Sequence, residues 1–383
     1  MLNSNILKEN LQDSLLKYKV SIIVPTVRLE ENIKLIFYRL NKQLIYEFII
    51  IIDGPSREDM QGYSEFIQSD SRIKVFFTGR QGGPALARNC GIDKSLGDIL
   101  LFIDSDCIPM PELIEHHLKH YGNDKIVGVS GLTKLIPSKG MVSTAILHSG
   151  ALRSFRLGEL MDFVPWSTTS NLSVRREIAE KIKFDVSMVT AEDILFGYQI
   201  RKNGKLIKGE KDAIVEHAVW KGLYNTCKRA FMYGRGMGLL IYKNSREKLI
   251  DIATKKPDWE IFFLFNTIMH TILGIIFKKY ILFLFPLLYI ISFFIIFVLC
   301  NLFKYKRKFT IRNLFEVSIV GLFFISYGMG KIWEAMKRQR YKDLFIKLNY
   351  IPVMKMVVWF KVNLFLTLFY LASLIFILIW GHS

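Results

Sequence analysis

Two carboxylates separated by one residue follow a continuous apolar run in the first third of the chain. The run is Ile99–Ile103, and the carboxylates belong to Asp104 and Asp106. Carboxylates on a loop that leaves a buried strand are unfavourable unless a cation pairs with them. Mg²⁺ and Mn²⁺ take oxygen ligands and are often held by one or two carboxylates together with substrate phosphates. The pair therefore predicts a site for a divalent cation and a phosphorylated substrate.

A second acidic pair, Glu192-Asp193, precedes the segment Ile194–Lys202, whose pattern predicts an amphipathic helix. A carboxylate held next to a substrate hydroxyl can remove its proton during a reaction. Acids in the first turn of a helix also stabilise that turn by capping it and by interacting with the helix dipole. The two residues alone leave both interpretations open.

Two further groups of residues allow a functional and a structural interpretation. His217 ends a short expected strand, where its imidazole could bind a metal or serve only the packing of the fold. Lys228, Arg229 and Arg235 lie in a basic segment that could neutralise a diphosphate, because arginine pairs well with phosphate. The same segment could instead face lipid headgroups.

Short apolar runs alternate with amphipathic stretches around these residues, which is typical of a largely parallel sheet covered by helices. In open α/β sheets, ligands bind beyond the carboxyl ends of the strands. We therefore expect the acids that follow the strands to meet at one edge. The expected strands are Val20–Pro25, Glu47–Asp53, Ile73–Phe77 and Asp98–Asp104, with helices over Glu30–Lys42 and Pro84–Ser95.

Five short motifs occur in the order found in glycosyltransferase family 2, whose members have the GT-A fold. Residues 18–240 thus resemble this family, which implies an α/β GT-A domain that uses a nucleotide-sugar. The motifs are Ser21–Thr26, Ile51–Ser56, Ala87–Gly91, Phe102–Asp106 and Ala191–Asp193.

The resemblance also implies roles for individual residues. Pro25, Thr26 and Asp53 are expected to contact the base or ribose of the nucleotide, with Arg88 bordering that site. Asp104 is expected near the sugar-nucleotide, and Asp106 on the Mg²⁺ or Mn²⁺ that bridges the diphosphate. Asp193 is the expected catalytic base, beside Glu192. The implied donor is a UDP-sugar or a GDP-sugar.

Long apolar runs occupy the last third of the chain. A helix needs about 20 apolar residues to cross the hydrocarbon core of a bilayer. The runs predict three or four membrane segments, because the first contains Asn266 and His270 and could lie in the interface instead. We expect an amphipathic segment over residues 1–17, the glycosyltransferase domain over 18–245, and interfacial and transmembrane helices over 246–383. The membrane segments are 261–277, 280–303, 314–333 and 357–380.

The positive charge of the chain is concentrated in the same region as the apolar runs. Of the net charge of +18, residues 259–383 contribute +11, from 15 Lys and Arg against 4 Asp and Glu. Basic loops beside apolar runs suit anionic lipid headgroups, so membrane lipids rather than nucleic acid are the expected partners. The scattered Cys90, Cys107, Cys227 and Cys300 indicate a reducing compartment. With no leader at the N-terminus, we expect a multi-pass protein of the cell membrane with a cytoplasmic catalytic domain.

The leading hypothesis is metal-dependent, inverting transfer of one sugar to a membrane-associated acceptor, either a lipid-linked saccharide or a polyprenyl phosphate. A processive polysaccharide synthase and exporter is the first alternative, which the absence of a Q-x-x-R-W motif near residue 230 disfavours. A catalytically inactive membrane scaffold with the same fold is the second, because a fold does not by itself establish a function. The sugar, the pathway and the oligomeric state stay open.

Overall fold

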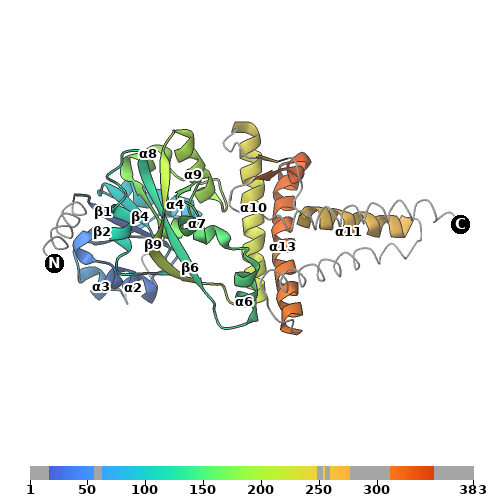
Figure 1. Cartoon of the computed structure of the whole chain (residues 1–383), viewed down its shortest axis with the longest axis horizontal. Coiled ribbons are helices and arrows are strands. Elements are labelled where there is room, and N and C mark those ends of the chain that lie inside the picture. Colours follow the sequence, from blue (N-terminus) through green and yellow to red (C-terminus); the bar gives the residue numbers. More distant parts are fainter. Residues whose placement is uncertain (1–16, 56–62, 248–252, 255–258, 277–310, 349–383) are drawn as a thin grey trace. The chain divides into compact units, whose positions relative to one another are not determined.

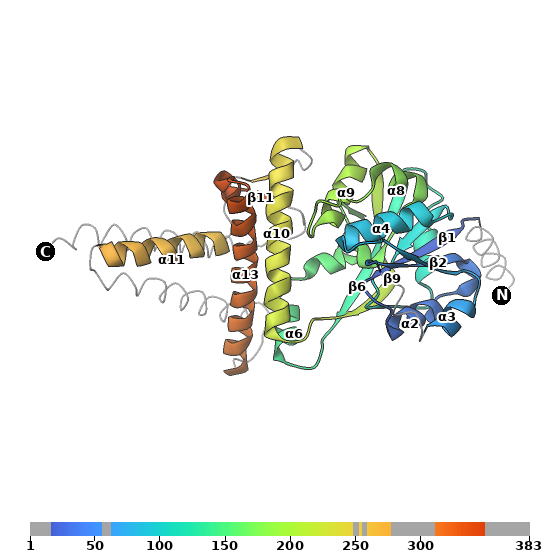
Figure 2. The same cartoon turned by 180° about the vertical axis from the view of Figure 1, so that it is seen from behind.

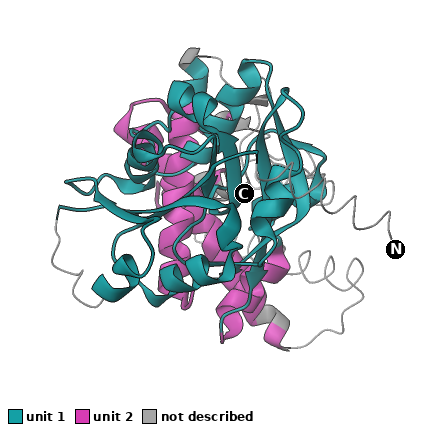
Figure 3. Ribbon diagram, turned by 90° about the vertical axis from the view of Figure 1, so that its left-hand side faces the viewer, with its two compact units in different colours: residues 1–138, 150–219, 243–251 teal, residues 139–149, 220–242, 252–383 magenta. Residues whose placement is uncertain are grey.

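A computed structural model describes residues 17–55, 63–247, 253–254, 259–276 and 311–348 (Figure 1). The chain divides into two compact units (Figure 3). The first unit comprises residues 1–138, 150–219 and 243–251, and the second comprises 139–149, 220–242 and 252–383. This division differs from the expected domain ranges, because residues 139–149 and 220–242 join the C-terminal unit.

A mixed sheet forms the centre of the first unit, with nine strands in its described part. Strands β1 to β4 run parallel to one another, in the order β3-β2-β1-β4. The order continues β8-β6-β9-β5, with β7 beside β9, and in this half only β6 and β9 pair in parallel. The strands are β1 Val20–Thr26, β2 Ile45–Ile52, β3 Ile73–Phe77, β4 Ile99–Phe102, β5 Cys107–Pro109, β6 Ile126–Ile136, β7 Phe163–Val164, β8 Leu172–Arg175 and β9 Leu206–Ala218.

Helices cover both faces of the parallel half of the sheet (Figures 1 and 2). Successive residues of β1 point to opposite faces, so Ile22 packs in the core that includes α2, while Ile23 lies against Gly91 of α4. The helices of this unit are α2 Glu31–Arg39, α3 Ser64–Gln68, α4 Gly83–Lys94, α5 Leu113–Leu118, α7 Leu157–Leu160, α8 Arg176–Ile182 and α9 Glu192–Lys202, with short 3₁₀ turns η1 Lys42–Leu44, η3 Arg153–Arg156 and η4 Thr169–Asn171.

The expected elements of this half are confirmed with shifts of a few residues at their ends. The expected strand Ile73–Phe77 is observed with the same bounds, and the expected helix over Pro84–Ser95 is α4. The expected helix over Glu30–Lys42 ends early, at Arg39, and a separate 3₁₀ turn follows it. The alternation of apolar runs with amphipathic stretches therefore predicted this part of the fold correctly.

Close contact between two helix backbones organises the second unit. A Cβ atom on Gly234 of α10 would lie 1.8 Å from the Tyr327 carbonyl oxygen of α13, and one on Gly330 would lie 2.0 Å from that of Phe231. Glycine is required at both positions because any side chain would separate the helices. The helices of this unit are α6 Met141–Ser149, α10 Leu223–Glu247, α11 Trp259–Ile276 and α13 Ile311–Lys337, with the 3₁₀ turn η6 Tyr341–Phe345 and the strand pair β10 Ala253–Thr254 and β11 Lys347–Leu348. The last turn of α10, after residue 242, belongs to the first unit.

The expected membrane segments fall partly outside the described residues. Segments 280–303 and 357–380 lie there, as does the expected N-terminal helix apart from residue 17. Segment 261–277 corresponds to α11, and 314–333 lies within α13. Among the residues that can be described, no helix combines the length and the apolar character that crossing a membrane requires.

Candidate active site

Asp104 and Asp106 lie at the carboxyl edge of the parallel strands, as the sequence predicts. All four residues of β4 are buried, and the chain turns at Asp104, whose carbonyl oxygen accepts a hydrogen bond from the Cys107 backbone N–H at 3.0 Å. The turn ends as β5 begins. The side chain of Asp106 is 49% exposed and that of Asp104 is 32% exposed, so both carboxylates can reach a ligand.

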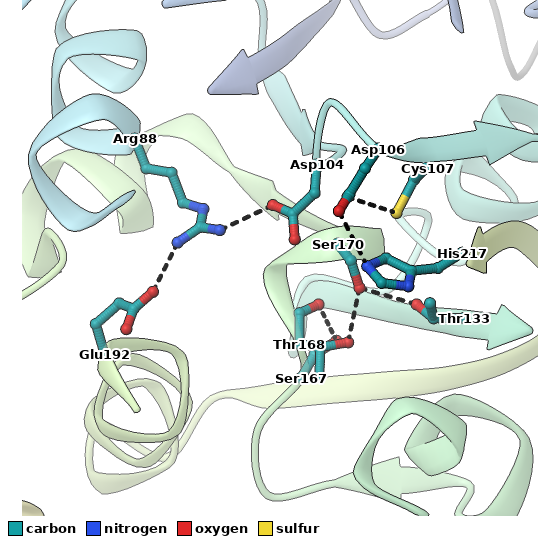
Figure 4. Close-up of polar contacts among 10 residues, drawn as sticks. All are labelled: Arg88, Asp104, Asp106, Cys107, Thr133, Ser167, Thr168, Ser170, Glu192 and His217. Atoms are coloured by element: carbon teal, nitrogen blue, oxygen red, sulfur yellow. Dashed lines mark hydrogen bonds and ion pairs between the residues drawn. The ribbon is translucent and has the colours of Figure 1, made fainter. Parts of the chain in front are cut away.

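The pairing of β5 with β9 brings His217 to Asp106. Cys107 lies opposite His217 in this antiparallel pair, and the His217 Nε2 atom is 3.3 Å from the Asp106 Oδ2 atom (Figure 4). The ligand atoms of Asp106, Cys107 and His217 all lie within 4.8 Å of one another. Burial raises the pKa of the Cys107 thiol well above its usual value, and a protonated thiol is a poor metal ligand. The remaining oxygen and nitrogen donors suit a cation such as Mn²⁺.

Arg88 joins the two acidic motifs. It lies on α4, is buried, and donates hydrogen bonds from Nη2 to Asp104 Oδ1 at 2.9 Å and from Nη1 to Glu192 Oε1 at 2.8 Å (Figure 4). Burial alone would lower the pKa of Arg88, but the two carboxylates raise it above its usual value. The arginine expected only to border the nucleotide is thus the link between Asp104 and the start of α9.

The Glu192-Asp193 pair begins α9 after a residue in a sparsely populated conformation. Ala191, which precedes the helix, has φ of 66°, in the left-handed region that L-residues other than glycine rarely adopt. Glu192 is directed to Arg88 and therefore does not cap the helix. Asp193 accepts a hydrogen bond from the Ile194 backbone N–H at 2.8 Å, so its structural interpretation is not eliminated.

Asp193 is nevertheless an unusual acid. Burial and, next, the charge of Glu192 raise its pKa, Arg88 lowers it, and the resulting pKa is about 8. Its side chain keeps only partial contact with solvent. A carboxylate that holds its proton near neutral pH is a stronger base once ionised, which is the property expected of a group that takes a proton from a hydroxyl.

Asp53 anchors the glycine-rich loop that follows β3. Its carboxylate accepts hydrogen bonds from the Gly82 and Gly83 backbone N–H groups at 3.0 and 2.8 Å and from the Thr78 hydroxyl at 3.0 Å. The Asp53 N–H in turn donates to the carbonyl of Thr26 at the end of β1. These bonds join the ends of β1, β2 and β3 to the first turn of α4. The expected contacts of Pro25, Thr26 and Asp53 with a nucleotide stay a prediction.

A run of hydroxyl side chains lies at the same edge of the sheet. Residues 167–171 precede β8, whose first residue, Leu172, pairs with Phe102 at the end of β4. Ser170 bonds the Thr133 hydroxyl at 3.0 Å, and Thr133 lies on β6 opposite Val215, two residues before His217 (Figure 4). The sequence analysis missed this loop, although five consecutive polar residues before a strand, Ser-Thr-Thr-Ser-Asn, are a recognisable signal.

The three basic candidates lie on α10 in the second unit. Lys228 is exposed, the Arg229 guanidinium lies 5.4 Å from the ring centre of Trp220, and Arg235 Nε donates to Glu334 Oε1 at 2.8 Å. Arg235 is thus already engaged by a buried carboxylate. Contact of these residues with a diphosphate stays a prediction.

Comparisons with known proteins agree with the motifs. Residues 21–182 match the family described as Glycosyl transferase family 2. A protein of Haemophilus influenzae described as an uncharacterized glycosyltransferase is 35% identical over 85 residues, which are 22% of this chain and 34% of that protein. Glycosyltransferase AglE of Haloferax volcanii is 23% identical over 222 residues, which are 57% of this chain and 72% of that protein.

A solved structure is also similar. It is a mannosyltransferase from Pyrobaculum calidifontis in complex with GDP-Man and Mn²⁺, with a TM-score of 0.49 and 16% identity, covering 60% of this chain and 65% of that one. The chain spans about a third (34%) of the Haemophilus relative. Residues 21–182 thus match the family that the motifs indicated, and the sheet covered by helices confirms the predicted α/β class.

Proposed function

We propose that this protein, whose residues 21–182 match glycosyl transferase family 2, transfers a single sugar from a nucleotide-sugar to a membrane-associated acceptor with inversion at the anomeric carbon. The observation that carries the proposal is the grouping of Asp104, Asp106 and His217 at the sheet edge where Arg88 also holds Glu192. That edge combines donors for a cation with an acid of raised pKa, Asp193.

Departure of a nucleoside diphosphate requires that its developing negative charge be stabilised. Asp106 and His217 would hold Mg²⁺ or Mn²⁺, which supplies positive charge next to the departing phosphate. Asp104 shares one oxygen with Arg88 and remains partly exposed, so its position is fixed before the donor binds. We favour a UDP-sugar as the donor, with a GDP-sugar as the alternative.

The acceptor hydroxyl must lose its proton as it attacks. Asp193 would accept that proton, and its raised pKa makes the ionised carboxylate a stronger base than an ordinary aspartate. Arg88 and Glu192 position the first turn of α9 through their ion pair. One base and a direct displacement, without a covalent sugar–enzyme intermediate, give a product of inverted configuration.

The hydroxyl loop before β8 suits contact with the transferred sugar. Sugars are recognised through their hydroxyl groups, and Thr168 of this loop is partly exposed at the edge where β4 ends, while Ser167, Thr169 and Ser170 are buried. Hydrogen bonds among these residues fix the loop, with Ser170 donating to Thr168 Oγ1 at 3.1 Å. The buried hydroxyls would therefore hold Thr168 in place, and Thr168 would be the residue of the loop that reaches the sugar.

The apolar runs and basic charge of residues 259–383 support an acceptor that is itself in a membrane. A lipid-linked saccharide or a polyprenyl phosphate fits this requirement, with the catalytic domain at the cytoplasmic face of the cell membrane. Single addition is favoured over processive synthesis because the sequence lacks a Q-x-x-R-W motif near residue 230.

The direct test is incubation of membranes containing the protein with a panel of radiolabelled nucleotide-sugars, followed by lipid extraction and NMR of the product. We expect one labelled sugar per lipid, of inverted configuration, formed only with Mg²⁺ or Mn²⁺. Long labelled chains would favour the processive alternative. No incorporation from any donor, with the same membranes supplying acceptor to a known transferase, would favour the inactive scaffold.

A further inference from the structure

Helix α13 exposes large apolar side chains along one side. Their exposed fractions range from 43% to 58%. Successive members are separated by seven, seven, four and three residues, and at 3.6 residues per turn these spacings place them on one face over most of the helix. This set, the apolar stripe, comprises Phe315, Leu322, Met329, Trp333 and Met336.

The packed side of α13 contains charged side chains among its apolar ones, whereas a helix on a water-soluble protein usually has its charged residues on the outer side. Glu316, Lys331 and Glu334 are all buried. Glu334 pairs with Arg235 of α10 at 2.8 Å and with Arg338 at 3.4 Å. These three charged groups thus face the protein beside the buried Ile319, Val320 and Phe323, while the apolar stripe faces outward. The outer side of α13 therefore suits an apolar environment.

Cations mark both ends of the apolar stripe. Arg312 precedes it, and Lys337 and Lys342 follow it, all three exposed. Exposed cations beside an apolar helix face are suited to lipid phosphates, with the apolar side chains in the headgroup boundary. A protein partner would not by itself require this border of positive charge, so the observations favour an anionic lipid surface as the occupant.

The neighbouring helix constrains the direction of α13. Helix α11 contacts α13 within the second unit and runs crosswise to it (Figures 1 and 2). Of two crosswise helices, at most one can follow the membrane normal. Residues 261–276 of α11 contain no charged side chain, whereas α13 contains Glu316, Lys331 and Glu334. Helix α13 is therefore the one suited to the plane of the surface.

We propose that α13 lies in the plane of an anionic membrane surface, with its apolar stripe at the headgroup boundary, rather than crossing the bilayer as its sequence predicts. The inference deepens the proposed function, because it rests on a membrane-bound acceptor and specifies how the chain meets the membrane. Its test needs no donor or acceptor, so it can fail while the proposed reaction stands.

The test measures the depth of spin labels in the full chain, reconstituted in phosphatidylglycerol nanodiscs. The four native cysteines are replaced, and single cysteines at Phe315, Leu322, Met329 and Met336 are labelled with a nitroxide. Collisions with oxygen and with a nickel chelate then give the depth at each site. Control sites are Leu96, which is 58% exposed in the first unit, and Val320, which is 1% exposed on the packed face of α13.

In-plane placement predicts the same shallow depth at all four sites, below the phosphates and different from both controls. Greatest depth at Leu322 and Met329 with shallow ends would mean that α13 spans the bilayer. Nickel collisions as frequent as at Leu96 would mean that the stripe faces water, and few collisions with either reagent, as at Val320, would mean that protein covers it. Any of these three results overturns the proposal.

The choice of an anionic surface is tested by repeating the measurement in phosphatidylcholine. The label at Met336 lies beside Lys337, so we expect at least twofold more nickel collisions there than in phosphatidylglycerol. Equal collision rates in the two lipids would contradict the requirement for anionic headgroups.

Discussion

Each unit of the protein contains a buried cluster of arginine and carboxylate side chains, and the two differ in which charge is in excess. In the first unit a single arginine, Arg88, lies between Asp104 and Glu192, and Asp193 adds a third acid. In the second unit a single acid, Glu334, lies between Arg235 and Arg338. Both clusters contain arginines and carboxylates, but acids are in excess in the first and arginines in the second.

The difference indicates what each cluster can do. Where acids outnumber the arginine, one carboxyl group has a raised pKa, and a metal cation placed beside the cluster would be attracted to it. Where arginines outnumber the acid, the buried charge is neutralised and the cluster joins α10 to α13. An excess of buried acid thus indicates chemistry, whereas the neutralised acid indicates packing.

The largest effect is expected from Asp193→Asn. Asparagine keeps the shape and the capping ability of aspartate but cannot accept the proton, so turnover should fall by roughly 10²–10⁴. Donor affinity should be unchanged and the variant should unfold at no lower temperature, because Asn has no buried charge to desolvate, which titration calorimetry and thermal melting would measure. Near-normal turnover of the variant would mean that Asp193 only caps α9.

The matching change in the other cluster is Glu334→Ala. Removing one partner of a buried ion pair costs roughly 3–5 kcal/mol, and the lower end applies here because Arg235 and Arg338 keep some contact with solvent. Chemical denaturation in detergent would measure the loss, with Glu180→Ala on the surface of α8 as the control. Nucleotide binding should persist at low denaturant. A variant as stable as the parent would contradict the packing role.

A change of pH profile is expected from Glu192→Gln. Because Asp193 must be ionised to act, kcat/KM should rise with pH through a pKa of about 8 in the parent protein. The charge of Glu192 raises the pKa of Asp193, so removal of that charge should move the rise of kcat/KM to lower pH. The measurement is kcat/KM between pH 5 and 9. If kcat/KM rises at the same pH as in the parent protein, or at a higher pH, Glu192 does not raise the pKa of the base.

The smallest effect is expected from Ala191→Gly. Glycine adopts the left-handed region without the strain of about 1 kcal/mol or more that alanine has there, so the free energy of unfolding should rise by up to about 1 kcal/mol. The control is Ala179→Gly within α8, where the same replacement should destabilise by at least about 0.5 kcal/mol. Destabilisation at both positions would mean that position 191 carries no strain.

The sequence predicted the parts of this account that depend on local pattern. Apolar runs identified β1 to β4, and the acids after them were expected to meet at one edge because parallel strands end together. The link through Arg88 could not be predicted, because nothing in the residues around it distinguishes an exposed arginine on α4 from a buried one. Its partner Glu192 is 104 residues away in sequence.

Other features also had no signal in the sequence. The sequence left open whether His217 is a metal ligand or a structural residue. The pairing of β5 with β9 places it opposite Cys107. The left-handed conformation of Ala191 has no signal in the sequence, since alanine normally favours a helix. Hydropathy predicted a membrane span over 314–333, which stays a prediction, and it could not show that Glu316, Lys331 and Glu334 are buried.

The central claim is that Asp106 and His217 bind a divalent cation together with a nucleoside diphosphate. Titration calorimetry of UDP and GDP, with Mn²⁺ and with excess chelator, tests it on the parent protein and on Asp106→Ala. The account predicts that one nucleotide binds the parent protein only when Mn²⁺ is present, and that this binding is lost in Asp106→Ala. Equal nucleotide affinity in chelator, or unchanged Mn²⁺-dependent binding in the variant, would contradict it.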